Sequence, residues 1–209
     1  MGVSPSGIST TKRRRETASL EVPRRSGLYA SAESFWRLCA ANRDLRLERT
    51  ARGEVIVMAP AGSDSGWRNG KLTQRLGNWS DADGTGEFFD SSTGYTLPND
   101  AVRSPDASWI TRDRWLIVPP ESRKKFAPIC PDFVVELTSP SETIAMARKK
   151  MREYLEQGVR LGWLLDPSTG RVEVYRPGRE VEALDRPATL SGEGVLPGFV
   201  LDLKGILFD

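Results

Sequence analysis

The sequence predicts a mixed α/β protein built around a central β-sheet. Phe133-Val-Val-Glu-Leu is a near-continuous apolar run, which is typical of a strand covered on both faces. A helical pattern over 142–157 follows it, and the apolar run Leu161–Asp166 comes next. A strand, a helix and a strand joined by short links usually form a right-handed parallel crossover, so these segments predict the centre of the sheet.

The elements before this crossover can be assigned in chain order. Ser31 is a good N-cap for a helix that continues through Ala-Glu-Ser-Phe-Trp-Arg-Leu-Cys-Ala-Ala. Leu45–Glu48 and Glu54–Met58 predict a β-hairpin with Gly53 in its turn. The spacing of apolar residues predicts a second helix over about 64–79.

Short strands separated by polar turns follow the second helix. Segments rich in aromatic or β-branched residues predict strands at Glu87–Phe89, Thr93–Leu97 and Pro105–Ile110. Residues 111–130 predict a surface excursion that is helical around Arg112–Ile117. The last predicted strands are Val172–Tyr175 and short segments that end near 201–207.

Length and composition place the chain among soluble globular proteins. Of its 209 residues, 38% are hydrophobic and 28% are charged, which predicts one domain over residues 27–209. No apolar stretch approaches the roughly 20 residues that cross a bilayer, and the N-terminus lacks the apolar core of a signal peptide. We therefore expect a cytoplasmic protein without a membrane partner.

The first 26 residues differ in character from the rest. They are rich in Ser, Thr, Arg, Gly and Pro, and they carry six Lys or Arg against two Glu. This composition predicts a disordered basic tail. Such a tail could bind phosphates, although short basic runs are more often simply solvated. The rest of the chain has a slight acidic excess, which disfavours a role as a sequence-independent coat on DNA.

The chain contains no histidine. This excludes Ser-His-Asp and Cys-His catalysis, histidine-ligated zinc and imidazole general bases. The two cysteines, Cys39 and Cys130, provide neither a disulfide framework nor a metal-ligand spacing, and we expect both to be buried apolar residues. Any chemistry must therefore use carboxylates, lysines, hydroxyl groups and hard cations.

Two carboxylates on neighbouring predicted strands, Asp106 and Glu136, form a candidate metal site. Glu136 lies inside an apolar strand, where an unpaired charge is costly to bury. Asp132 faces the same side of that strand, but four residues place it roughly 13 Å from Glu136. Mg²⁺ holds its ligands at about 2.1 Å, so Glu136 needs a partner from an adjacent strand about 5 Å away. Asp106 meets this requirement, and we expect Asp132 only to begin the strand.

A cation beside these acids must come from the following helix. Thr138 is on the same face as Glu136, at the position where a lysine would be well placed, so the strand itself supplies none. The helix offers Lys149 and Lys150. At about 100° per residue, Lys149 points away from the apolar stripe of the helix and Lys150 lies on its flank, about 90° from the centre. We expect Lys150 to reach the acids and Lys149 to be solvated.

Each of these residues also has a purely structural interpretation. An aspartate after a proline, as at Asp106, is often a turn former, and lysines on helix flanks are common. Asp166, which precedes a proline, is interpreted as a turn residue. Three polar residues of the second helix would line a cleft or simply cover its surface: Arg68, Asn69 and Lys71.

Several segments resemble the Uma-two family of restriction-endonuclease-like proteins. They are Pro-Asp-Ala-Ser-Trp-Ile at 105–110, Pro-Asp-Phe-Val-Val-Glu-Leu-Thr-Ser-Pro-Ser-Glu at 131–142, and Lys-Met-Arg-Glu-Tyr-Leu-Glu-Gln-Gly-Val-Arg-Leu-Gly-Trp-Leu-Leu-Asp-Pro at 150–167. Arg-Val-Glu-Val-Tyr-Arg-Pro-Gly at 171–178 and Val-Leu-Pro-Gly-Phe at 195–199 resemble the closing segments of the family. The segments occur in order and cover about 31–209, which leaves out the basic tail.

The resemblance implies the PD-(D/E)xK, or restriction-endonuclease-like, fold: a central mixed sheet flanked by helices, with the N-terminal helix and hairpin attached. It implies that Asp106 and Glu136 bind Mg²⁺ or Mn²⁺ and that Lys150 orients the attacking water, so these three are the expected catalytic residues. Glu48 in the hairpin stands where family members often carry a Glu, and it is a further candidate metal ligand. Many members have a histidine where this chain has Trp-Arg-Asn at 67–69, so the chain departs from the family there.

The function implied is that of a metal-dependent endonuclease that hydrolyses DNA phosphodiester bonds. DNA is then the expected partner, and cleavage of both strands would suit a homodimer. The alternative is a catalytically inactive module that keeps the nuclease fold and binds nucleic acid or a partner protein. A glycosidase is disfavoured because nothing in the sequence places the tryptophans in a groove beside paired acids.

Overall fold

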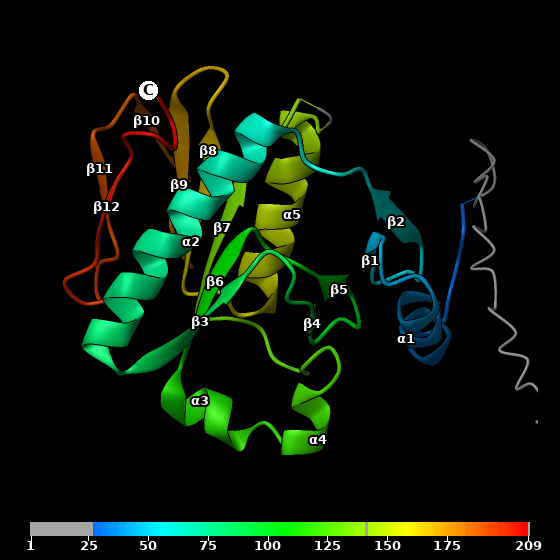
Figure 1. The fold of residues 1–209 in the computed structure, drawn as a ribbon. Coiled ribbons are helices and arrows are strands. Elements are labelled where there is room, and N and C mark those ends of the chain that lie inside the picture. The colour runs from blue at the N-terminus through cyan, green and yellow to red at the C-terminus, as the bar shows by residue number, and fades with distance from the viewer. Residues whose placement is uncertain (1–26, 141, 209) are drawn as a thin grey trace, which may run out of the picture.

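A computed structural model describes residues 27–140 and 142–208 (Figure 1). The predicted basic tail, residues 1–26, lies outside the described residues. The helices are α1 (Ala32–Ala41), α2 (Ser63–Asp83), α3 (Arg112–Ile117), α4 (Pro120–Arg123) and α5 (Ile144–Gln157). The strands of the first half are β1 (Arg46–Arg49), β2 (Val55–Met58), β3 (Gly86–Asp90), β4 (Tyr95–Thr96), β5 (Val102–Arg103) and β6 (Ala107–Thr111). Those of the second half are β7 (Phe133–Leu137), β8 (Leu161–Asp166), β9 (Arg171–Tyr175), β10 (Glu182–Asp185), β11 (Thr189–Ser191) and β12 (Val200–Asp202).

A six-stranded sheet in the order β10-β9-β8-β7-β6-β3 forms the centre of the protein. Strands β7 and β8 are parallel and are connected through α5, whereas the other neighbours in this sheet are antiparallel. The sheet is therefore mixed, and the predicted α/β architecture with helices on a central sheet is confirmed. No helix in the described residues is both long enough and apolar enough to cross a membrane.

The predicted hairpin β1–β2 belongs to a second sheet, which the sequence did not predict. Its order is β2-β1-β5-β4. The predicted strand 93–97 is reduced to the two residues of β4, the predicted strand 105–110 corresponds to β6, and β5 was not predicted. Pro105 lies between β5 and β6, and because a proline has no N–H to donate, it favours a break between them.

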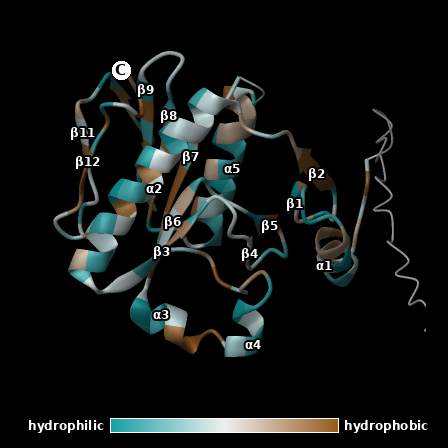
Figure 2. Cartoon of the chain, viewed as in Figure 1, coloured by the Kyte–Doolittle hydropathy of each residue, from teal (hydrophilic) through white to brown (hydrophobic). Residues whose placement is uncertain are grey.

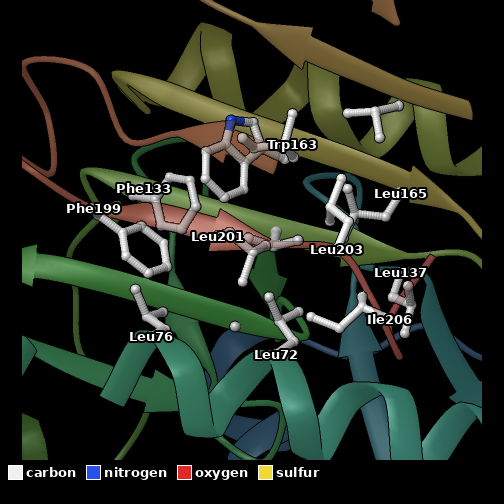
Figure 3. Packing of buried hydrophobic residues seen from close by; sticks show 14 of the residues in the cluster. Leu72, Leu76, Phe133, Leu137, Trp163, Leu165, Phe199, Leu201, Leu203 and Ile206 are labelled. Atoms are coloured by element: carbon white, nitrogen blue, oxygen red, sulfur yellow. The ribbon is translucent and has the colours of Figure 1, made fainter. Parts of the chain in front are cut away.

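Two hydrophobic layers cover the two faces of the central sheet. On one face, α2 and the C-terminal segment pack against the sheet, with Leu72, Leu76, Leu201 and Ile206 in the core (Figure 3). On the other face, α5 packs through a buried stripe that includes Met151. Figure 2 shows hydrophobic ribbon in the central strands and hydrophilic ribbon along parts of α2 and α5.

Strand β7 divides its side chains between these two faces. Phe133, Val135 and Leu137 belong to the α2 side of the core, whereas Val134 belongs to the α5 side. Since side chains alternate along a strand, Glu136 also points to the α5 side. The one carboxylate of this strand is therefore directed at the helix that follows it in the chain.

Glycines set the ends of the two long helices. Helix α2 continues to Asp83 and is capped by Gly84 at φ 70°, so it is longer than the predicted 64–79. Helix α5 begins after Thr143, whose hydroxyl accepts a hydrogen bond from the amide of Met146, and ends at Gly158 with φ 113°. Left-handed backbone of this kind is accessible mainly to glycine, which explains where both helices stop.

Gly86 at the start of β3 is a position where a side chain cannot fit. A Cβ there would overlap the indole of Trp109 and the main-chain oxygen of Ile110, and both groups are held in the core and the sheet. Gly86→Ala is therefore expected to lower the free energy of unfolding by about 1–3 kcal/mol, measured by urea denaturation. Gly66→Ala is the matched control, because a Cβ there meets open space within a helix, and it should be neutral or raise stability by up to about 1 kcal/mol. Equal transition midpoints for the two variants would show that Gly86 is not sterically constrained.

Candidate active site

Asp106 and Glu136 meet where β6 and β7 pair. The antiparallel register places Ala107 opposite Val135, so Asp106, immediately before β6, stands beside Glu136. One carboxylate oxygen of Asp106 accepts a hydrogen bond of 2.8 Å from the main-chain amide of Leu137. The two acids therefore lie at the same end of adjacent strands, on the side of the sheet that α5 covers.

Lys150 extends from α5 into this cluster. Its Nζ lies 2.9 Å from Glu136 Oε1 and 2.8 Å from Glu48 Oε1. The residue is only 9% exposed and belongs to the buried stripe of the helix, together with Ala147. The sequence predicted a position on the flank of the apolar stripe; the structure places Lys150 within the buried stripe, because the acids provide partners there. Lys149 is exposed, as predicted.

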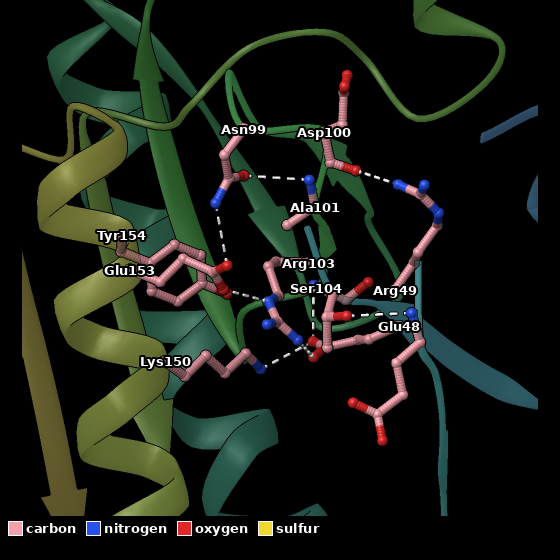
Figure 4. A network of polar contacts seen from close by, with 12 residues as sticks. Glu48, Arg49, Asn99, Asp100, Ala101, Arg103, Ser104, Lys150, Glu153 and Tyr154 are labelled. Atoms are coloured by element: carbon pink, nitrogen blue, oxygen red, sulfur yellow. Dashed lines mark hydrogen bonds and ion pairs between the residues drawn. The ribbon is translucent and has the colours of Figure 1, made fainter. Parts of the chain in front are cut away.

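Glu48 reaches the cluster from the second sheet, through the hairpin strand β1 (Figure 4). It is 3% exposed. Its Oε1 accepts a hydrogen bond of 2.9 Å from the amide of Ser104, and its Oε2 accepts one of 3.0 Å from Arg103 Nη1. Arg103 also donates from Nε to Glu153 of α5 at 2.6 Å. An ion-pair network thus joins β1, β5 and α5 around Lys150.

Two further residues position the acids. Tyr154 of α5 donates its hydroxyl hydrogen to Glu136 Oε1 at 2.9 Å, and Asn69 of α2 donates from Nδ2 to Asp106 Oδ1 at 3.1 Å. The sequence assigned Tyr154 no part in the site and left Asn69 open between a cleft and a helix surface. The spacing of Tyr154, one helical turn after Lys150, was the available signal that both reach the same site.

Burial sets the protonation of the two acids on the central sheet. Burial is the main cause of the raised pKa of Glu136, which is about 8. The charge of Lys150 lowers this pKa, and the charges of Asp106 and Glu48 raise it further. Burial also raises the pKa of Asp106, against the hydrogen bond from Leu137 and the charge of Lys150. Both carboxyl groups therefore hold protons more strongly than ordinary acids.

The pKa values of Glu48 and Lys150 shift in the directions that keep both groups charged. Burial alone would raise the pKa of Glu48, but the charges of Lys150 and Arg103 outweigh it and lower the pKa below its usual value. Burial alone would lower the pKa of Lys150, but Glu136 and Glu48 raise it above its usual value. Lys150 is therefore a cation at neutral pH.

Carboxylates outnumber cations in this cluster. The acids are Glu48, Asp106, Glu136 and Glu153, and the cations that form ion pairs with the three glutamates are Lys150 and Arg103. Within residues 27–140 and 142–208, no group of three acidic or cysteine side chains is already arranged to hold a metal ion, and the Lys150 ammonium lies between two of the acids. Carboxylate oxygens are the hard ligands that a divalent cation such as Mg²⁺ prefers, and the acids, once ionised, exceed the cations in charge, so the cluster fits such an ion.

Other residues considered from the sequence have structural roles. Asp132 is fully buried; it accepts a hydrogen bond of 2.9 Å from the amide of Thr111 and lies 2.8 Å from Arg114 Nη1, so it fixes the start of β7 as predicted. Asp166 accepts hydrogen bonds from residues of its own turn and one of 3.2 Å from the hydroxyl of Thr138.

Arg68 and the two cysteines were also considered from the sequence. Arg68 pairs with Asp64 and donates to the carbonyl of Ile206. Cys130 is buried, which raises the pKa of its thiol to about 12, and Cys39 is half-buried rather than buried as predicted.

Comparisons with known proteins agree with this fold. The crystal structure described as a "putative nuclease belonging to DUF820" from Anabaena variabilis matches with a TM-score of 0.70 and 21% sequence identity, over 85% of this chain and 97% of that chain. At this identity the match shows the fold, and the predicted restriction-endonuclease-like fold is confirmed. A comparison with curated proteins finds no match. The family Uma2, described as "Putative restriction endonuclease", matches residues 32–204, and the chain therefore belongs to the Uma2 family.

Proposed function

We propose that the protein is a divalent-metal-dependent endonuclease that hydrolyses phosphodiester bonds in DNA. The observation that carries the proposal is the meeting of Asp106, Glu136 and Lys150 at one end of the central sheet, with Glu48 added from the second sheet. Membership of a restriction-endonuclease family and the nuclease-like fold support the same reaction class. We further propose that it works in the cytoplasm, and that cleavage of both strands would require a homodimer.

In this proposal Asp106 and Glu136 hold the metal, and Glu48 is an additional ligand. The Leu137 amide and Asn69 fix the orientation of the Asp106 carboxylate, and Tyr154 fixes that of Glu136. Bound Mg²⁺ or Mn²⁺ would supply Lewis-acid chemistry, polarising the phosphodiester and making water a stronger nucleophile.

Lys150 is the positively charged side chain that acts on the substrate in this proposal. Its pKa is raised by Glu136 and Glu48, so it keeps its proton and cannot act as the general base. It can instead donate hydrogen bonds, which orient the attacking water and stabilise the negative charge that develops on the phosphate. This requires the ammonium to give up at least part of its bonding to the two glutamates.

The proposal is tested by incubating the full-length protein with supercoiled plasmid DNA at neutral pH in Mg²⁺ or Mn²⁺. We expect nicked or linear product in either metal and none when EDTA removes it, with a return of activity when metal is added in excess. Gel electrophoresis reads the products. DNA binding without cleavage in either metal would instead support the inactive-module interpretation.

A further inference from the structure

A third cation, Arg46, lies beside the carboxylate cluster, on the hairpin strand that carries Glu48. Arg46 and Glu48 are two residues apart on β1, so their side chains leave the same face of the strand. The residue between them, Leu47, turns the other way, into the small core under α1. Arg46 therefore faces the central sheet, as Glu48 does.

The guanidinium of Arg46 is anchored at the edge of the central sheet next to Asp106. Its Nη2 donates a hydrogen bond of 2.6 Å to the carbonyl of Ser91. The β3–β6 register pairs Asp90 with Ala107, so Ser91 and Asp106 lie at the same end of these two strands. The positive charge of Arg46 acts to lower the pKa of the Asp106 carboxyl group, against the effect of burial.

Arg46 differs from the other cations of the site in what it binds. Lys150 and Arg103 are each engaged by two carboxylates. Arg46 is half-buried, and in the part of the chain that the structure describes it forms no ion pair and makes one hydrogen bond, to a main-chain carbonyl. A guanidinium has five N–H donors, so most of those on Arg46 remain available to a ligand.

We propose that Arg46 binds the phosphate group of the DNA that enters the carboxylate cluster, donating to its non-bridging oxygens. Arginine matches phosphate oxygens with two parallel N–H donors, and a cation at the edge of an acidic cluster favours the entry of an anionic substrate. The inference rests on the proposed nuclease function, and it assigns the substrate-binding role to a residue outside the three expected catalytic ones.

The test compares Arg46→Gln and Arg46→Lys with Arg52→Gln, which removes the same charge from an exposed position in the turn of the same hairpin. In single-turnover cleavage with Mg²⁺, Arg46→Gln should lose about 100-fold in rate. Arg46→Lys should keep part of the rate, and Arg52→Gln should stay within about twofold of wild type. Urea denaturation must show folded protein for each variant.

A second readout separates phosphate binding from support of the metal site. Calorimetric titration with Mn²⁺ should show no large loss of affinity in Arg46→Gln, because the carboxylates are unchanged and the substitution removes a positive charge, which repels the metal cation. The slope of log K for duplex DNA against log salt, measured in non-catalytic Ca²⁺, should fall by about one in Arg46→Gln.

Three results would overturn the inference in distinguishable ways. Equal cleavage rates for Arg46→Gln and Arg52→Gln, with wild type active, remove the phosphate role and leave the nuclease function standing. A loss of Mn²⁺ affinity in Arg46→Gln that matches its loss of cleavage makes Arg46 a support for Asp106 instead. A wild-type protein that neither binds nor cuts DNA overturns the nuclease function and this inference together.

Discussion

Glu136→Gln should reduce metal-dependent DNA cleavage by at least about 10³-fold while the protein stays folded. The amide keeps the size of the side chain but removes the negative charge that a divalent cation requires. The loss of stability should be small, within about 1 kcal/mol, because a carboxyl group with a pKa of about 8 is already largely protonated at neutral pH without metal. Plasmid cleavage and urea denaturation measure the two quantities on the same preparations.

Glu156→Gln is the control for this substitution, because Glu156 lies on the exposed side of α5. It should retain wild-type cleavage. Asp106→Asn should behave like Glu136→Gln, since both acids are proposed to hold the same ion. If Glu136→Gln cleaves DNA as fast as Glu156→Gln, Glu136 is not a metal ligand and the catalytic assignment is wrong.

Lys150→Met should lower both stability and activity. It removes the cation that bonds to Glu48 and Glu136 at 2.8 and 2.9 Å and leaves two buried carboxyl groups without it. Breaking a buried ion pair from one side costs about 3–5 kcal/mol, and we expect a value near the lower end because Arg103 still pairs with Glu48. Urea denaturation in EDTA measures the change.

The neighbouring residue provides a closely matched comparison. Lys149→Met makes the same chemical change at an exposed position of the same helix, and it should alter stability by no more than about 0.5 kcal/mol. The double variant Lys150→Met with Glu136→Gln should be about as stable as Lys150→Met, because Glu136, whose pKa is about 8 even beside Lys150, is largely protonated once the lysine is removed. Equal denaturation midpoints for Lys149→Met and Lys150→Met would show that the buried ion pairs contribute nothing to folding.

Local pattern was enough to predict the part of the fold that carries the acids. The apolar run of β7, the amphipathic α5 and the apolar run of β8 lie next to one another in the sequence, and each is long enough to show its period. The adjacency of Asp106 and Glu136 followed from strand spacing and metal geometry, and the β6–β7 register agrees with it.

The second sheet and the rest of the site could not be predicted in this way. Strands β4 and β5 have two residues each, too few to show a periodic pattern, and their pairing with the hairpin depends on long-range contacts. Glu48 meets Arg103 from 55 residues away, and Asn69 meets Asp106 from 37. Helical phase did select Lys150 over Lys149, but it placed Lys150 on the flank of the apolar stripe, because the phase of one helix does not show the buried carboxylates with which Lys150 pairs.

The decisive measurement is a crystal of the protein soaked in Mn²⁺ and recorded for anomalous scattering. We expect one strong peak at about 2.1 Å from carboxylate oxygens of both Asp106 and Glu136, with the Lys150 ammonium moved away from Glu136. A fully soaked crystal without a peak between these two acids, and with Lys150 still bonded to Glu48 and Glu136, would show that the cluster is a structural ion-pair network and no metal site.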